Sequence, residues 1–218
     1  MGGSQHHAER PPHIHLTVCL MPLTVCVFGS SSSRTPLDYM VQAKRMGQLL
    51  AEAGITCING AGTAGVMGSL NEGLHLHNGK VIGVTHEMWD NGGKHSFFQL
   101  VVASGKNLAV RKELLLEKAD CFIVLPGGPG TFDELWEVLS EKQMGLRNHP
   151  VVIVNLNGYF EGTILQLKRA MDDGILYIDA AELVQIVDNV DQAVEFCLKG
   201  TSGGNKNLSG FISERNVD

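Results

Sequence analysis

The sequence predicts an α/β fold of the doubly wound, Rossmann-like kind, a three-layer sandwich around a mainly parallel sheet. Short apolar runs of strand length alternate along the chain with stretches of helical periodicity. The apolar runs are continuous, which is typical of parallel strands that are covered on both faces. Glycine-rich turns follow several of these runs, at the strand ends where open parallel sheets bind ligands.

The elements follow one another in a regular order. The first strand is the apolar run at 23–28. Its helix begins near Pro36 and ends at about Ala53, before Gly54, because proline suits a first helical turn and glycine a helix end. The other predicted strands are 55–58, 80–84, 98–102, 121–125, 150–156 and 183–187. The other predicted helices are 65–79, 106–118, 131–145, a segment that ends at about Asp173, and 191–200.

Length and composition favour one domain between polar ends. The chain has 218 residues, of which 44% are hydrophobic, and this suits a single α/β domain of ordinary size. We place this domain at 22–199. Residues 1–21, rich in Gly, Pro and His, read as a disordered leader whose histidines are solvated, and the polar segment 200–218 reads as a flexible tail.

Charge and cysteine usage exclude several kinds of partner. The net charge is −6 and no Lys/Arg-rich run exists, so we expect no nucleic-acid partner. The apolar stretch at 14–28 is short for a membrane span and Pro22 interrupts it, so we expect no membrane association. The five cysteines include no C-x-x-C pair, which predicts a reduced, cytoplasmic protein without a disulfide framework.

Three small-residue turns follow predicted strands. They are GSSSS at 29–33, GAGTAG at 60–65 and PGGPGT at 126–131. The second contains G-x-G-x-x-G, a weak dinucleotide signal by itself, and the acidic residue that an NAD site needs lies beyond the next strand, at Glu87. We therefore favour a mononucleotide, with the glycines also allowing close packing. The third turn is not a Walker A loop, because no Gly-Lys-Ser/Thr ends it.

The third turn places acids beside an anion site. Backbone N–H groups at a helix start bind anions, and we expect Asp133 and Glu134 in the first turn of this helix. On local pattern alone, Thr131 and Glu134 also match a capping box, in which Glu134 only closes the helix end. The excess of glycine and the second carboxylate favour a ligand site, since two neighbouring acids repel unless a ligand or cation engages them.

Arg111 has two interpretations of equal weight. Its helix face is either solvated, with Arg111 paired to Glu113 or Glu117, or it points the guanidinium into the pocket to grip phosphate. His75 and His77, two residues apart on a predicted helix, face different directions, so we expect no metal site there.

Taken together, these residues resemble the LOG family, the cytokinin-activating nucleoside 5′-monophosphate phosphoribohydrolases often labelled "lysine decarboxylase-like". The family signature P-G-G-x-G-T-x-x-E matches Pro126 to Glu134 in full. The second turn is similar to the family's G-G-G-x-x-G-L-M-G, with Ala61 in place of a glycine, and Gly29-Ser30-Ser31 and Arg111-Lys112 match its G-S-S and R-K. The similarity covers about residues 23–199.

The resemblance implies cleavage of the N-glycosidic bond of a nucleoside 5′-monophosphate, cytokinin-like or AMP-like, to free base and ribose 5-phosphate. It implies that Arg111 and Glu134 are the catalytic pair and that Asp133 hydrogen-bonds the ribose hydroxyls of the substrate. It further implies no metal, no cofactor and a homodimer or larger homo-oligomer. The remaining substrate-binding residues that it suggests are Gly29, Ser30, Gly62, Lys112, Gly127, Gly128, Pro129, Gly130 and Thr131.

The segment 88–98 departs from the family pattern, so the sequence does not identify which base the substrate carries. Trp89 or Phe97 either stacks on a base or packs within the protein, and we favour packing within the protein. A true pyridoxal phosphate decarboxylase needs a Schiff-base lysine in a strand-end turn, and the sequence offers none. Two further alternatives remain: another N-glycosidase, such as a deoxyribosyltransferase, and a non-catalytic nucleotide or cofactor carrier similar to molybdenum-cofactor carriers. The presence of both Arg111 and Glu134 favours an enzyme.

Overall fold

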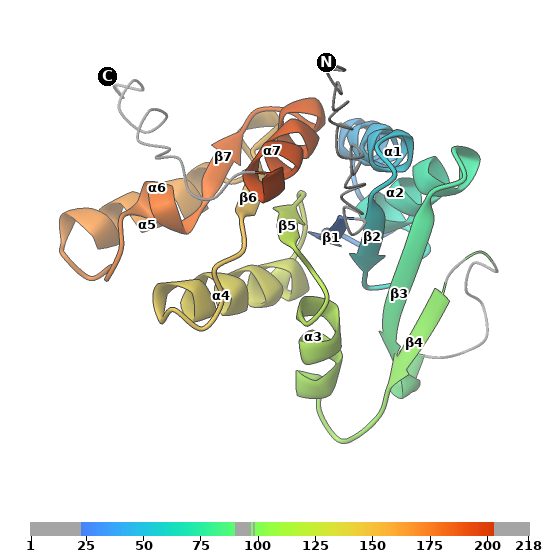
Figure 1. The fold of residues 1–218 in the computed structure, drawn as a ribbon, viewed down its shortest axis with the longest axis horizontal. Coiled ribbons are helices and arrows are strands. Elements are labelled where there is room, and N and C mark those ends of the chain that lie inside the picture. Colours follow the sequence, from blue (N-terminus) through green and yellow to red (C-terminus); the bar gives the residue numbers. More distant parts are fainter. Residues whose placement is uncertain (1–22, 90–96, 98, 203–218) are drawn as a thin grey trace, which may run out of the picture.

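The computed structural model describes residues 23–89, 97 and 99–202 (Figure 1). The predicted leader at 1–21 lies outside them, as does the predicted tail from residue 203 on. The strands are β1 Thr24–Phe28, β2 Thr56–Asn59, β3 Lys80–His86, β4 Gln99–Ala103, β5 Cys121–Val124, β6 Val151–Val154 and β7 Gln185–Val187. The helices are α1 Leu37–Glu52, α2 Gly65–Leu76, α3 Ala109–Leu116, α4 Pro129–Gln143, α5 Glu161–Asp172, α6 Ala180–Leu183 and α7 Val190–Ser202, with short 3₁₀ turns η1 Glu87–Trp89 and η2 Leu156–Gly158.

The described strands form one sheet in the order β4-β3-β2-β1-β5-β6-β7, and every neighbouring pair is parallel. The chain starts in the middle, builds outward to β4, and returns through α3 to β5 on the other side of β1. This confirms the predicted doubly wound fold. The reversal of direction between β1 and β5 is the point at which such sheets bind ligands.

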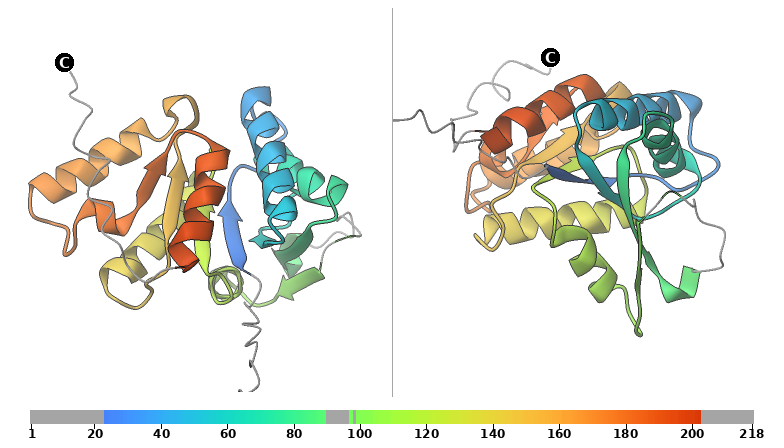
Figure 2. Two further views of the ribbon diagram at one scale, coloured as in Figure 1. Left: turned by 45° about the horizontal axis from the view of Figure 1, so that its top comes forward. Right: turned by 45° about the vertical axis from the view of Figure 1, so that its right-hand side comes forward.

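Helices cover both faces of the sheet (Figure 2), and a hydrophobic core lies on each face. Val25 and Val27 of β1 join the core under α1, α2 and α7, whereas Cys26 and Phe28 join the core under α3, α4, α5 and α6. Successive side chains of a strand point to opposite faces, so burial on both faces explains why the strands are apolar throughout. Across the described ranges, no helix is both long and apolar enough to cross a bilayer.

Helix α4 begins earlier than predicted, at Pro129, because proline fixes a backbone angle that suits the first helical position. The first turn then holds no acidic residue. The expectation that Asp133 and Glu134 lie in that turn is therefore wrong, since both fall one turn further along. The short helix α6 was not predicted: it is a single turn, capped by the Asp179 carboxylate, which accepts a hydrogen bond from the Ala181 N–H at 2.8 Å.

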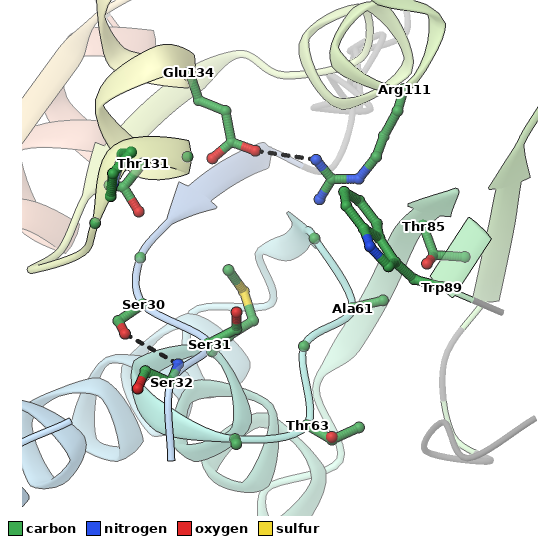
Figure 3. Close-up of a pocket in the computed structure, with 18 residues that line it drawn as sticks. Ser30, Ser31, Ser32, Ala61, Thr63, Thr85, Trp89, Arg111, Thr131 and Glu134 are labelled. Carbon is green, nitrogen blue, oxygen red and sulfur yellow. Dashed lines mark hydrogen bonds and ion pairs between the residues drawn. The ribbon is translucent and has the colours of Figure 1, made fainter. Parts of the chain in front are cut away.

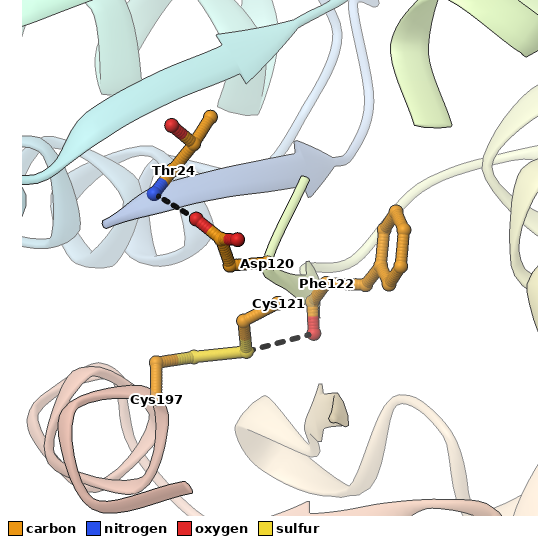
Figure 4. The surroundings of a disulfide bond; sticks show 5 residues. All are labelled: Thr24, Asp120, Cys121, Phe122 and Cys197. Atoms are coloured by element: carbon orange, nitrogen blue, oxygen red, sulfur yellow. Dashed lines mark hydrogen bonds between the residues drawn. A yellow bond between two sulfur atoms is a disulfide. The ribbon is translucent and has the colours of Figure 1, made fainter. Parts of the chain in front are cut away.

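A disulfide joins Cys121, at the start of β5, to Cys197 on the buried face of α7 (Figure 4). This corrects the expectation of a protein without disulfides. The two cysteines are 76 residues apart in sequence, yet α7 packs over β5 and brings their Cα atoms to 6.1 Å. No local spacing could reveal such a pair. Cys26 and Cys57 are buried as free thiols, and Cys19 lies outside the described residues.

Candidate active site

A cavity of about 780 Å³ opens at the carboxyl ends of β1, β2, β3 and β5, at the predicted edge of the sheet (Figure 3). All three predicted turns contribute to its wall, together with side chains of α2, α3 and α4, one residue of β3 and one of the turn that follows it. The lining residues are Gly29, Ser30, Ser31, Ser32, Gly60, Ala61, Gly62, Thr63, Ala64, Met67, Thr85, Trp89, Arg111, Gly128, Pro129, Gly130, Thr131 and Glu134.

The first turn is held between the other two. The Ser30 N–H donates to the Pro126 carbonyl at 3.0 Å, and the Ser30 carbonyl accepts from the Met67 N–H at 3.0 Å. Gly29 has no room for a side chain, since a Cβ there would lie 2.6 Å from Cγ1 of Val66. These backbone contacts fix the three turns relative to one another and so define the shape of the cavity.

A buried amide network, which the sequence analysis missed, supports the second turn. The Asn59 side-chain amide donates to Oδ1 of Asn71 at 2.7 Å, while its own carbonyl oxygen accepts from the Ala61 N–H at 2.9 Å. The Asn71 amide donates in turn to the Gly62 carbonyl at 3.2 Å. Both asparagines are fully buried. The available signal was Asn71, a polar residue on the apolar face of α2 between Met67 and Leu74, because buried amides are kept only where they are hydrogen-bonded.

Ala61 carries backbone strain, because it adopts a φ of 58° where the family pattern has a glycine. A left-handed conformation costs a residue with a Cβ about 1–2 kcal/mol. We expect Ala61→Gly to raise the free energy of unfolding by about 0.5–1 kcal/mol, once the greater freedom of glycine in the unfolded chain is offset. Urea denaturation measures this. The matched change Ala64→Gly, at a φ of −132° in the same turn, should not stabilise the protein.

The third turn leads directly into α4, and none of the described side chains caps this helix. The capping-box alternative is therefore wrong: Gly128 is the N-cap and Thr131 lies inside the helix. Gly127 is required by packing, because a Cβ there would collide with the Thr131 side chain. The Tyr159 hydroxyl donates a hydrogen bond to the Gly127 carbonyl at 2.6 Å and fixes the turn from outside the cavity.

Gly128 and Gly130 differ from Gly127, because the fold does not need them to be glycine. Neither has a positive φ, and a Cβ at either position would meet no atom of the described residues within 4 Å beyond its immediate chain neighbourhood. Both line the cavity. The missing side chains leave the start of α4 open to a ligand, and a bare helix start attracts anions.

Arg111 and Glu134 meet inside the cavity. A guanidinium nitrogen of Arg111 lies 3.3 Å from Oε1 of Glu134, and Nε donates to the Val84 carbonyl at 3.1 Å. The two side chains are only 12% and 13% exposed. Gly60 makes room for the arginine, since a Cβ there would lie 2.5 Å from Nη2. Of the two interpretations of Arg111, the structure therefore supports the one that points into the pocket.

Burial raises the pKa of Glu134 to about 7, because desolvation disfavours the carboxylate more than the neighbouring Arg111 favours it. A carboxyl group with such a pKa holds or releases a proton readily near neutral pH. This property is common among catalytic acids and bases in clefts.

Three predicted binding residues lie outside the cavity wall. Gly127 supports the turn from behind. Lys112 lies 3.2 Å from a carboxylate oxygen of Asp133 and 2.8 Å from one of Glu137, and the Asp133 side chain is 57% exposed. Successive residues of a helix point about 100° apart, which explains why Glu134 faces the cavity and Asp133 does not. The roles of Lys112 and Asp133 toward a substrate stay predictions.

The two aromatic candidates after β3 have different surroundings. Phe97 stacks on His75, with ring centroids 4.2 Å apart, and packs against the core. Trp89 instead lines the cavity and remains 47% exposed. Residues 90–96 and 98 of this segment lie outside the described part of the chain. Within that described part, no three His, Cys, Asp or Glu side chains gather as metal ligands.

The fold and the site define a Rossmann-like α/β protein with a buried carboxylate–guanidinium pair in the same cavity as an open helix start. A family model described as "Possible lysine decarboxylase" matches residues 67–197, and the chain belongs to that family. A cytokinin riboside 5′-monophosphate phosphoribohydrolase of Mycobacterium marinum is 31% identical over 179 residues, covering 81% of this chain and 94% of the relative. One from Arabidopsis thaliana is 32% identical over 171 residues, covering 78% of each.

Solved structures share the fold. The molybdenum cofactor carrier protein of Chlamydomonas reinhardtii superposes with a TM-score of 0.63 at 21% identity, covering 84% of this chain and all of the carrier. DNA processing protein A of Streptococcus pneumoniae superposes with a TM-score of 0.54 at 13% identity, and the match covers 80% of this chain and 61% of that protein. At these identities the likeness extends to the architecture alone.

The word decarboxylase in the family description implies pyridoxal phosphate, and the residues present do not fit that cofactor. Its chemistry needs a lysine that can form a Schiff base beside the phosphate site. None of the described residues that line the cavity is a lysine. Lys112, which neighbours Arg111 on α3, is engaged by Asp133 and Glu137, and the hydrogen bond to Glu137 raises its pKa. We therefore derive no decarboxylation step.

Proposed function

We propose that the protein hydrolyses the N-glycosidic bond of a nucleoside 5′-monophosphate and releases the free base and ribose 5-phosphate. The buried Arg111–Glu134 pair beside the open start of α4 carries this proposal, because it combines an anion site with a carboxyl group of raised pKa in one cavity. Relatives named as cytokinin riboside 5′-monophosphate phosphoribohydrolases support it. We propose an adenine-type base, either plain or cytokinin-like.

In this proposal the phosphate binds at the N–H groups at the start of α4, with Ser30 on the same side of the cavity. The bond between the anomeric carbon and the base nitrogen breaks, and the electron pair leaves with the base, which takes up a proton. The sugar passes through an oxocarbenium-like state that the Glu134 carboxylate stabilises. Water then adds to the anomeric carbon and gives one proton to Glu134, which passes it to the released base, so that the OH of water ends on the sugar and its H on the base. Arg111 offsets negative charge on the phosphate or on the departing base.

The pH dependence of kcat/KM should show the ionisation of Glu134 in the free protein. Because the carboxylate is the active form and its pKa is raised to about 7, we expect kcat/KM to rise with pH through about 7 and then level off. The protonated form is favoured in the folded state, so the stability that Glu134 contributes falls as pH rises from about 4.5 to about 7. A profile of kcat/KM against pH and urea denaturation at several pH values measure the two effects. A kcat/KM that is flat from pH 5 to 9 would contradict this assignment.

The direct test is to incubate the protein with AMP, with isopentenyladenosine monophosphate and with adenosine, and to measure released base and ribose 5-phosphate. We expect release from the two monophosphates and not from adenosine, which lacks the group held by α4. Tight binding of AMP without release would instead support the alternative, a non-catalytic nucleotide carrier. Release from unphosphorylated deoxynucleosides would contradict the phosphate site and favour a deoxyribosyltransferase-type enzyme.

The open glycines give a more local prediction. Gly130→Ala should leave the free energy of unfolding within about 0.5 kcal/mol of wild type or raise it, because a Cβ there has free space. The same methyl group enters the space that the phosphate needs, so we expect KM for AMP to rise about 10-fold or more, in line with a lost charge-assisted hydrogen bond. Gly162→Ala, at a helical glycine with equally free space outside the cavity, is the matched control and should leave KM unchanged.

We also propose a homo-oligomer, dimeric or larger, that acts in the cytoplasm. Several large apolar side chains of η1 and of β4, at the edge of the described sheet, are exposed, among them Met88, Leu100 and Val102, and exposed apolar side chains of this kind favour an interface. Light scattering after gel filtration tests the oligomeric state. A nucleotide substrate favours the cytoplasm, whereas structural disulfides such as Cys121–Cys197 are rare there. Thiol alkylation in intact cells, followed by mass spectrometry, tests whether this pair is oxidised in place.

A further inference from the structure

Trp89 is a large apolar side chain that stays exposed in the cavity. It follows β3 in the 3₁₀ turn η1, lines the cavity, and keeps 47% of its surface exposed. Most tryptophans are largely covered in folded proteins, and an exposed indole inside a cleft favours contact with a ligand. The proposed function uses Arg111 and Glu134 and leaves this ring unexplained.

The ring is fixed in place. The Arg111 guanidinium carbon lies 5.5 Å from the centre of the indole, as in a cation–π contact. The imidazole of His86 meets the indole edge-on, with centroids 6.2 Å apart. His86 itself is 1% exposed, and its Nδ1 accepts a hydrogen bond from the Met88 N–H at 3.3 Å. Trp89 is therefore pre-organised, so a ligand that contacts it need not order a mobile side chain.

Trp89 lies where the base of a bound nucleotide would be. In Figure 3, Thr131 and Ser30 lie on one side of the cavity and Trp89 and Thr85 on the other, with the Glu134 carboxyl group between them. If the phosphate binds at the start of α4 and the anomeric carbon faces Glu134, the base extends toward Trp89. This step depends on the proposed function, because it takes the phosphate position from it.

We propose that Trp89 is the base-recognition residue and that it stacks on the planar base of the bound nucleotide. Stacking on an aromatic side chain strengthens binding by about 10- to 100-fold per base and tolerates different ring substituents. The site then selects a nucleotide over a bare sugar phosphate through this one ring. It accepts adenine with or without a substituent on its exocyclic amine, since stacking uses the ring face.

Intrinsic fluorescence tests the contact directly, because the chain has only two tryptophans, Trp89 and Trp136. Trp136 lies on α4, does not line the cavity and is 41% exposed, so Trp136→Phe leaves Trp89 as the single reporter. In this background we expect AMP to quench the emission, and ribose 5-phosphate to bind without quenching. AMP that binds, as shown by calorimetry, without changing the emission would overturn the proposal.

Calorimetry on Trp89 variants gives the second readout. We expect Trp89→Ala to weaken AMP binding about 10- to 100-fold and Trp89→Phe to weaken it much less, while both bind ribose 5-phosphate like wild type. Unchanged AMP affinity in Trp89→Ala would refute the role of Trp89. If Trp89→Ala fails to bind even ribose 5-phosphate, the fluorescence experiment, which keeps the native ring, decides.

The two proposals fail in different ways. If AMP binds to the wild-type protein and quenches its fluorescence but no adenine is released, the hydrolase proposal is refuted and the stacking proposal stands. If the wild-type protein releases adenine but Trp89→Ala keeps its affinity for AMP, the stacking proposal is refuted and the hydrolase proposal stands.

Discussion

Glu134→Gln is expected to lower kcat for nucleoside monophosphate hydrolysis by about 10²–10⁴-fold, the usual loss when a positioned acid–base group is removed. Glutamine keeps the shape of the side chain and its contact with Arg111, but it can neither take a proton from water nor balance a positive charge on the sugar. KM should change much less, because the phosphate is held by the start of α4. Steady-state kinetics with AMP measures both constants.

A matched control lies on the same helix. Glu141 of α4 is also ion-paired, at 2.6 Å from Nε of Arg147, but it does not line the cavity. Glu141→Gln should therefore keep kcat within about 2-fold of wild type, as expected for a charge remote from the reacting atoms. Near-normal turnover by Glu134→Gln would remove Glu134 from the mechanism.

The position of the site could be predicted from the sequence, because it depends on local patterns. Continuous apolar runs predicted parallel strands buried on both faces, and the structure confirms this for the seven described strands. Turns rich in glycine and serine after the strands at 23–28, 55–58 and 121–125 predicted a common binding edge, and these turns do line one cavity. Parallel strands bring their carboxyl ends to the same edge, so sequence order alone was sufficient.

Features that depend on tertiary packing were not predictable in this way. Asp133 and Glu134 are neighbours in sequence, but only the start of α4 at Pro129 decides which of them faces the cavity. The disulfide depends on how α7 docks on β5, and the Asn59–Asn71 contact on how α2 docks on β2. The direction of Trp89 is set by Arg111 and His86, which come from different segments. Each of these needs a three-dimensional neighbour that no spacing encodes.

Arg111→Lys is expected to lower kcat/KM by about 10²-fold, although it keeps the positive charge. The guanidinium binds Glu134 and the Val84 carbonyl through different nitrogens while its central carbon lies over the ring of Trp89. A lysine ammonium is a point charge and cannot make all three contacts from one position. Each lost hydrogen bond to a charged group is worth about 1.5–3 kcal/mol, which gives this order of magnitude.

Comparing Arg111→Met, which removes the positive charge, with Arg111→Lys, which keeps it, separates the effect of that charge from the effect of the guanidinium contacts. Without the guanidinium only the smaller effect of Lys112 still opposes the burial of Glu134, so the pKa of Glu134 should rise above about 7 and the rising limb of the pH–rate profile should move to higher pH. Arg111→Lys should leave that limb nearly in place and lower its plateau. If both variants show the same limb as wild type, Arg111 does not control the ionisation of Glu134.

Arg147 provides a control that separates an effect of Arg111 in the cavity from an effect on the fold. It makes the same three kinds of contact as Arg111: an ion pair with Glu141, a hydrogen bond to the Leu116 carbonyl at 3.0 Å, and a guanidinium placed 5.6 Å from the ring centre of Phe122. Arg147→Lys therefore disturbs a similar set of interactions away from the cavity, and it should reduce stability without lowering kcat/KM. Equal losses of activity in the two variants would mean that Arg111 acts through the fold and not on the substrate.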